Sequence, residues 1–229
     1  MTVRVVLEVA PKRSFASAID WPGWSRGGRT EDDALAALLA YAPRYAAVAK
    51  RATVAFKPPA TARGLEIVER VNGGGGTEFG VPGTAAASED DPISAADLER
   101  LLALLTASWA VFDSAARKAV GVELTKGPRG GGRELPKMID HVREAEVAYL
   151  GQLGSRAPAA ADEDAAKPMA LLRRTLTDAL TAVATGKPIE NPRGTRKPWT
   201  PRYTVRRSAW HVLDHAWEIQ DRSGQHRDG

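Results

Sequence analysis

Two of the four histidines in the sequence lie four residues apart, at positions 211 and 215. On a helix, side chains at this spacing leave the same face about one turn apart and can bind one cation together. A third ligand from a neighbouring element would complete a site with open positions for water or substrate. Because the sequence contains no cysteine, a transition metal could use only histidine, carboxylate and water as ligands.

The segment that carries the pair, residues 208–222, is predicted to be an amphipathic helix. At 100° of rotation per residue, His211 and His215 border an apolar arc, and the two tryptophans of the segment belong to the core. Three other polar residues lie on or near the side of the histidines: Asp214, Glu218 and Arg222. The pair is therefore either part of a metal site or an ordinary polar helix edge.

His141 is the candidate for the third ligand. It lies in a second predicted helix, residues 134–153, on the side of Ala145 and Ala148, and should point inward. A buried imidazole needs a polar partner, because an unsatisfied polar group in a core costs about 1–3 kcal/mol. Two more imidazoles around a cation would supply one, and a hydrogen bond to a carbonyl or carboxylate is the alternative. The fourth histidine, His226, lies in a polar tail and is predicted to take no part.

Four amphipathic helices are predicted in the second half of the chain. Ser94 and Asp97 form a capping-box pattern that starts the first of them. The others cover residues 134–153, 168–186 and 208–222 and are joined by loops rich in glycine and proline. Since each apolar stripe has to be buried, we predict an all-α four-helix bundle over residues 93–223, followed by a flexible tail at 224–229.

The first half shows the period of two that is typical of strands. Apolar residues alternate over positions 3–9, which places Arg4 and Glu8 on the opposite face. Further strands over 14–21 and 64–71, and a helix from Thr30 to about residue 49, predict a small α+β domain with an antiparallel sheet and one helix in residues 1–82. The glycine-rich and acidic segment 73–93 is predicted to be a linker or a long loop.

The composition is that of a folded globular protein, with 43% hydrophobic and 26% charged residues in a chain of 229. The net charge of +4 comes from 32 basic and 28 acidic residues that are interspersed, so we do not expect a nucleic-acid partner. The sequence has neither a signal-peptide pattern nor an apolar stretch of ~18 residues, so we expect a cytoplasmic protein without a membrane span.

Two stretches, IDHVREAEVAYLGQLG around His141 and RRSAWHVLDHAWEIQDR around His211 and His215, resemble the DinB-like (DinB/YfiT-type) superfamily. The resemblance covers roughly residues 93–223. It implies a four-helix bundle whose second helix gives one metal-binding histidine and whose last helix gives the H-x-x-x-H pair. It also implies a divalent transition metal (zinc, nickel or iron) and, as in many members, a thiol-dependent activity such as that of the bacillithiol S-transferases.

On this resemblance, His141, His211 and His215 are the metal ligands of an enzyme that acts on a small-molecule substrate. Glu218 and Asp214 are the catalytic candidates, because either of them, or Glu144, could orient an imidazole from its far side. Ser208 and Arg222 are the candidates for substrate contact. Because the chain has no cysteine, any thiol nucleophile would be an external low-molecular-weight thiol. A metal-activated hydrolase is the other reaction considered.

The stretch FASAIDWPGWSRGGRTEDDALAAL resembles the HicB-like antitoxin fold, in which a strand ends in a D-x-P-G turn and a G-x-T run starts the helix. The matching residues are Asp20, Pro22, Gly23, Gly28, Thr30, Asp33, Ala34 and Leu35. This resemblance covers about residues 2–50. It gives an alternative function, a non-enzymatic interaction protein whose first half binds a protein partner. A bundle that keeps the site without turnover, and a homodimer formed through an exposed strand edge, are further expectations.

Overall fold

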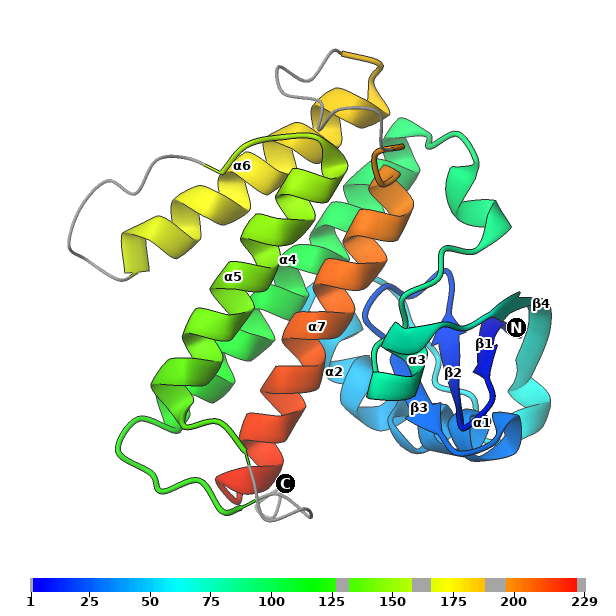
Figure 1. The fold of residues 1–229 in the computed structure, drawn as a ribbon, viewed down its shortest axis with the longest axis horizontal. Coiled ribbons are helices and arrows are strands. Elements are labelled where there is room, and N and C mark those ends of the chain that lie inside the picture. The colour runs from blue at the N-terminus through cyan, green and yellow to red at the C-terminus, as the bar shows by residue number, and fades with distance from the viewer. Residues whose placement is uncertain (1, 127–131, 158–165, 188–196, 226–229) are drawn as a thin grey trace. The chain divides into compact units, whose positions relative to one another are not determined.

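The computed structural model describes residues 2–126, 132–157, 166–187 and 197–225 (Figure 1). The chain divides into two compact units. The first contains residues 1–107 and 205–210, and the second contains residues 108–204 and 211–229. Two long helices, α4 (Ala95–Lys118) and α7 (Pro201–Arg222), contribute residues to both units. The domain boundaries at residues 82 and 93 stay a prediction.

A four-stranded sheet forms the centre of the first unit, with the order β3-β2-β1-β4. The strands are β1 (Val3–Ala10), β2 (Arg13–Ala18), β3 (Ser25–Gly28) and β4 (Leu65–Asn72). The first three are antiparallel neighbours, whereas β4 returns beside β1 in the parallel direction. The α+β order of elements is confirmed, but the sheet is mixed and not antiparallel. A helical crossover between β3 and β4 accounts for this, since parallel neighbours need such a connection.

The single helix that was predicted from Thr30 to residue 49 is in fact two helices, α1 (Glu31–Ala40) and α2 (Ala42–Arg51). The capping box is present, because the Thr30 hydroxyl accepts a hydrogen bond from the Asp33 N–H and the Asp33 carboxylate accepts one from Thr30. The break falls at Tyr41, where Pro43 occupies the first turn of α2. Proline lacks an N–H and is tolerated at a helix start but not in an interior, which explains the break.

The segment predicted to be a linker is folded onto the first unit. It contains the short helix α3 (Gly75–Phe79) and a 3-10 turn, η2 (Ala87–Asp90), and we call residues 73–91 the strap. The buried Glu8 carboxylate accepts hydrogen bonds from the Thr77 hydroxyl and from the N–H groups of Gly83 (3.0 Å) and Thr84 (3.1 Å).

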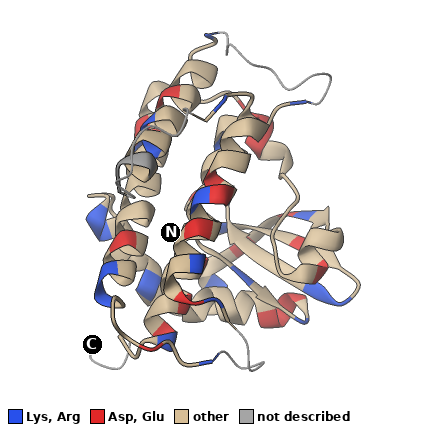
Figure 2. Ribbon diagram, turned by 60° about the vertical axis from the view of Figure 1, so that its left-hand side comes forward, with Lys and Arg blue, Asp and Glu red and all other residues tan. Residues whose placement is uncertain are grey.

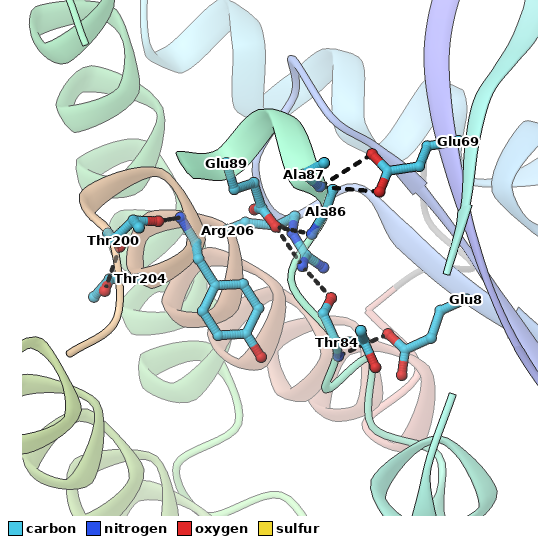
Figure 3. Close-up of polar contacts among 10 residues, drawn as sticks. Glu8, Glu69, Thr84, Ala86, Ala87, Glu89, Thr200, Thr204 and Arg206 are labelled. Carbon is cyan, nitrogen blue, oxygen red and sulfur yellow. Dashed lines mark hydrogen bonds and ion pairs between the residues drawn. The ribbon is translucent and has the colours of Figure 1, made fainter. Parts of the chain in front are cut away.

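A second buried carboxylate fixes the far end of the strap. Arg206 of α7 donates to Glu89 over 2.6 and 2.9 Å, and the Glu89 carboxylate also accepts from the Ala86 N–H (Figure 3). Glu69 on β4 accepts from the Ala87 N–H over 2.9 and 3.1 Å. Three carboxylates thus satisfy backbone donors of the strap, which explains how a glycine-rich segment holds one conformation.

The second unit is built from helices. Its elements are the C-terminal half of α4, α5 (Leu135–Leu153), α6 (Ala166–Ala184) and most of α7. Each helix buries an apolar stripe, exemplified by Phe112 on α4, Val142 on α5, Leu176 on α6 and Ile219 on α7. The predicted helices are therefore present. Helix α7 begins at Pro201, seven residues before the predicted segment, because the Thr200 hydroxyl caps the N–H of Tyr203.

Charged residues of both signs are spread over the helices and the sheet (Figure 2). No helix within the described residues is long and apolar enough to cross a membrane. The predicted tail begins at residue 224. Its last four residues, 226–229, which include His226, lie outside the described residues.

Candidate metal centre

Three imidazoles converge in the second unit, one from α5 and two from α7. One ring nitrogen of each of His141, His211 and His215 lies within 4.8 Å of the other two. The Nε2 atoms of His141 and His211 are 3.2 Å apart. Tetrahedral ligands with metal–nitrogen bonds of about 2.0–2.1 Å would be separated by roughly 3.3 Å, so this pair already has the spacing of two ligands of one ion.

Local sequence explains why the rings meet. His211 and His215 lie one turn apart on α7, which brings their ring centroids to 4.7 Å. Helix α5 has Pro136 in its first turn and ends at Gly154, whose φ of 100° fits a glycine C-cap. It presents His141 to both partners, with centroid distances of 4.9 Å to His211 and 5.1 Å to His215.

Glu218 holds the His215 ring by one of its two nitrogens. Its Oε2 atom lies 3.1 Å from Nδ1 of His215, which leaves Nε2 as the nitrogen of that ring available to a metal. The hydrogen bond with His215 lowers the pKa of Glu218 below its ordinary value, and the charge of Arg222 adds to this against the effect of burial. Glu218 therefore stands where a carboxylate would fix the tautomer and orientation of His215 if that imidazole bound a metal.

Arg222 holds Glu218 in turn. It also joins the end of α7 to residues that lie between α4 and α5 in the sequence. Its Nη1 atom donates to Glu218 over 3.0 Å and to the carbonyl of Arg133 over 2.8 Å, and its Nε atom donates to the carbonyl of Thr125 over 2.7 Å. A Cβ atom at Gly132 would lie 2.6 Å from the Arg222 guanidinium carbon, so only glycine permits this approach.

The electrostatic surroundings favour the neutral form of His141 by lowering its pKa. Burial lowers its pKa most, and the positive charge of Arg133 lowers it further, while Glu144 and Glu218 act in the opposite direction. A neutral imidazole has the free nitrogen lone pair that a metal requires. Of the three residues, His141 is partly exposed, whereas His211 and His215 are buried.

An aromatic row adjoins the cluster on the side away from Glu218. The ring of Tyr149 lies edge-on to His211 with centroids 5.9 Å apart, and Trp199 lies beside Tyr149 at 5.3 Å. Tyr203 follows at 4.7 Å from Trp199. None of these three aromatic residues was predicted to belong to the site. Its one detectable signal was the position of Tyr149, eight residues after His141 on the same helix stripe.

The remaining predicted site residues lie as follows. Asp214 is partly buried on α7, and Glu144 is exposed on α5. Ser208 is fully buried in the part of α7 that belongs to the first unit, and its hydroxyl has no hydrogen-bond partner among the described residues. The substrate-binding roles of Ser208 and Arg222 stay predictions. The structure adds Thr125 and Arg133, whose backbone carbonyls no sequence pattern singles out.

Comparisons of the chain with protein-family models, with curated proteins and with solved structures give no match. The chemistry of the site therefore has to be argued from its own residues. Three imidazole nitrogens without a cysteine suit a divalent transition metal such as zinc, nickel or iron. Three protein ligands also leave coordination positions for a water or a substrate.

Proposed function

We propose that the second unit is a metal-dependent enzyme of the DinB-like type, with α4 to α7 arranged as a four-helix bundle. The single observation that supports this most is the convergence of His141, His211 and His215, with Glu218 behind one ring. A polar strip on a helix edge would not require a third imidazole from another helix. Nor would it require a carboxylate that is itself held by a buried arginine.

The reaction we propose is the transfer of a low-molecular-weight thiol to an electrophilic small molecule. When bound, the metal supplies a Lewis acid that lowers the pKa of a coordinated thiol or water. The chain supplies three imidazoles, and Glu218 and Arg222 keep the His215 ring in place. Since the chain has no cysteine, the sulfur nucleophile comes from outside. We regard Asp214 as the second catalytic candidate.

Elemental analysis of protein purified without a metal-affinity step tests the metal site. We expect close to one transition-metal ion per chain, and we expect this to be lost in H211A and in H141A. His226→Ala is the matched control, since the sequence predicts no part in the site for His226, and its metal content should equal that of the unaltered protein. Absence of metal in the unaltered protein, even after incubation with Zn²⁺, Ni²⁺ or Fe²⁺, would refute the proposal.

The thiol reaction is tested separately. Metal-loaded protein is incubated with a small thiol and an alkylating electrophile, and the thioether product is measured by mass spectrometry. We expect product formation to depend on metal and to disappear in H211A. Metal binding without any thiol-dependent turnover would leave a hydrolase as the better proposal, to be tested with ester and amide substrates.

One observation favours a second function for the first unit. Phe79, at the end of α3, is 90% exposed although the strap around it is held by buried carboxylates. Phenylalanine is among the residues that are enriched at protein–protein interfaces. If the protein is an interaction module, F79S should abolish its biological activity, whereas the triple alanine variant of His141, His211 and His215 should retain it. The opposite pattern would favour the enzyme.

A further inference from the structure

The surroundings of the histidine cluster differ at its two ends. Toward the end of α7 they are charged, because Glu218 and Arg222 follow His215 on that helix. Toward the start of α7 they are aromatic, because Tyr149 adjoins His211 and Trp199 adjoins Tyr149. A molecule bound at the cluster therefore meets ionic groups on one side and rings on the other.

A stripe along α5 connects His141 with the rings. Ala145 lies four residues after His141, and Tyr149 lies four residues after Ala145, so the three side chains share one helix face. The methyl group of Ala145 is the smallest side chain that a helix can place there without the cost of glycine. Ala145 is partly exposed, so this face carries only a small side chain between the His141 imidazole and the Tyr149 phenol ring.

The ring platform is fixed in position and is partly open. The backbone N–H of Trp199 donates to the backbone carbonyl of Gln152 over 2.9 Å. This hydrogen bond joins the segment before α7 to the end of α5. Tyr203 is buried behind Trp199, whereas Tyr149 and Trp199 are both partly exposed. Rings that served only as core would be expected to be buried to the same degree as Tyr203.

We propose that the substrate carries a planar apolar group, and that this group lies over Ala145 against Tyr149 while a polar head binds at the three-histidine centre. This inference depends on the proposed metal function. It makes Tyr149 and Ala145 residues that determine specificity, and it identifies the substrate class as aromatic or similarly flat compounds with a metal-binding head.

The test uses two hydroxamates that bind metals through the same head, acetohydroxamate and benzohydroxamate. Both are titrated into Co²⁺-loaded full-length protein, and their dissociation constants are measured from the visible absorption of the metal. Because ring contacts beyond simple burial are typically worth up to about a factor of ten in affinity, we expect benzohydroxamate to bind up to ~10-fold more tightly.

Two substitutions remove the preference in different ways. Y149L keeps an apolar side chain but removes the ring, and A145L places a bulky side chain between His141 and Tyr149. Leucine is nearly as favourable in a helix as alanine. In both variants we expect the ratio of the two dissociation constants to fall to about one or two, with acetohydroxamate binding unchanged. V147A, an exposed position on the same helix, is the control and should keep the preference of the unaltered protein. Circular dichroism verifies that each variant is folded.

The outcomes separate the two proposals. Co²⁺ binding without a preference for benzohydroxamate, or with a preference that survives in Y149L and A145L, would overturn this inference and leave the metal site intact. Failure of Co²⁺ and Zn²⁺ to bind at all would overturn both.

Discussion

The Nδ1 atom of His215 lies 3.1 Å from the Oε2 atom of Glu218, less than one turn further along α7. Glu218 in turn accepts from Arg222, so three residues at spacings of three and four form a chain that ends at the ring of His215, one of the three clustered histidines. Carboxylates in this position raise the basicity of a ligating histidine and fix its tautomer.

Replacing this carboxylate should weaken metal binding. We expect Glu218→Gln to lower the affinity for Zn²⁺ by about 10- to 100-fold, because an amide does not supply the negative charge that stabilises the ligating imidazole. The measurement is a competition titration against a chromophoric zinc chelator. Asp214→Asn, on the same helix, should lower the affinity for Zn²⁺ less. An equal loss of affinity in both variants would contradict the assignment of this role to Glu218 alone.

Metal removal should lower thermal stability. A ligand at one hundred times its dissociation constant stabilises a folded protein by about 2.7 kcal/mol, which for a chain of this size corresponds to a Tm shift of about 5–10 °C. We expect this shift between metal-loaded protein and protein treated with a chelator, measured by calorimetry. The shift should be absent in H215A, and its persistence there would show that the metal binds elsewhere.

The buried Glu146 should make the stability depend on pH. Burial raises the pKa of this residue to about 7, although Arg173 and Trp109 act in the opposite direction. Its Oε2 atom lies 3.5 Å from Nε of Arg173, and Nη1 of Arg173 donates to Asp113 over 2.8 Å. Because the folded state holds a proton that the unfolded state releases, stability should fall as the pH rises from the ordinary glutamate pKa to about 7, and then level off.

Glu146→Gln tests this, since the amide keeps the neutral form of the side chain. We expect the variant to show a flatter profile between pH 4.5 and 7 and to be more stable than the unaltered protein above pH 7. Urea unfolding at a series of pH values gives the free energies. Asp178→Asn, at an exposed position of α6, is the control. A profile of E146Q that parallels that of the unaltered protein would contradict the assignment.

The ion pair between Arg206 and Glu89 should be critical for the first unit. Both side chains are buried, and removing one partner of such a pair leaves an uncompensated charge, at a cost of about 3–5 kcal/mol. We therefore expect Arg206→Met to reduce the free energy of unfolding by that amount, and the double variant with Glu89→Leu to recover part of it. Arg70→Met, which breaks an exposed pair with Glu31, should change it by at most ~1 kcal/mol.

The three histidines could be placed by sequence because helix periodicity fixes which residues share a face. His211 and His215 follow from their spacing, and the apolar residues around His141 indicated that it points inward. Glu218 was one of three carboxylates that fitted the pattern, and its contact with His215 distinguishes it from Glu144, which is exposed. Periodicity cannot choose among such neighbours, because the choice depends on side-chain rotamers and on Arg222.

Long-range contacts were beyond sequence reasoning. The alternation in β1 placed Glu8 on the face opposite the core, yet it is only 3% exposed because the strap covers that face. Glycine and acidic residues suggested a linker at 73–93, and no local pattern shows that carboxylates on β1 and β4 would bind its backbone. The clamp of Arg222 on Thr125 likewise depends on where a loop returns, which local propensities do not encode.

The hydrogen bonds of the strap also determine how the backbone of this segment meets solvent. The N–H groups of Gly83, Thr84, Ala86 and Ala87 each donate to a carboxylate. Their amide hydrogens can exchange with deuterium only when the hydrogen bonds to the glutamates break. A segment with the composition of a flexible tether should therefore exchange slowly and resist proteases. Glycine-rich sequence therefore marks a protected stretch of backbone in this protein, where composition alone would suggest a site of cleavage.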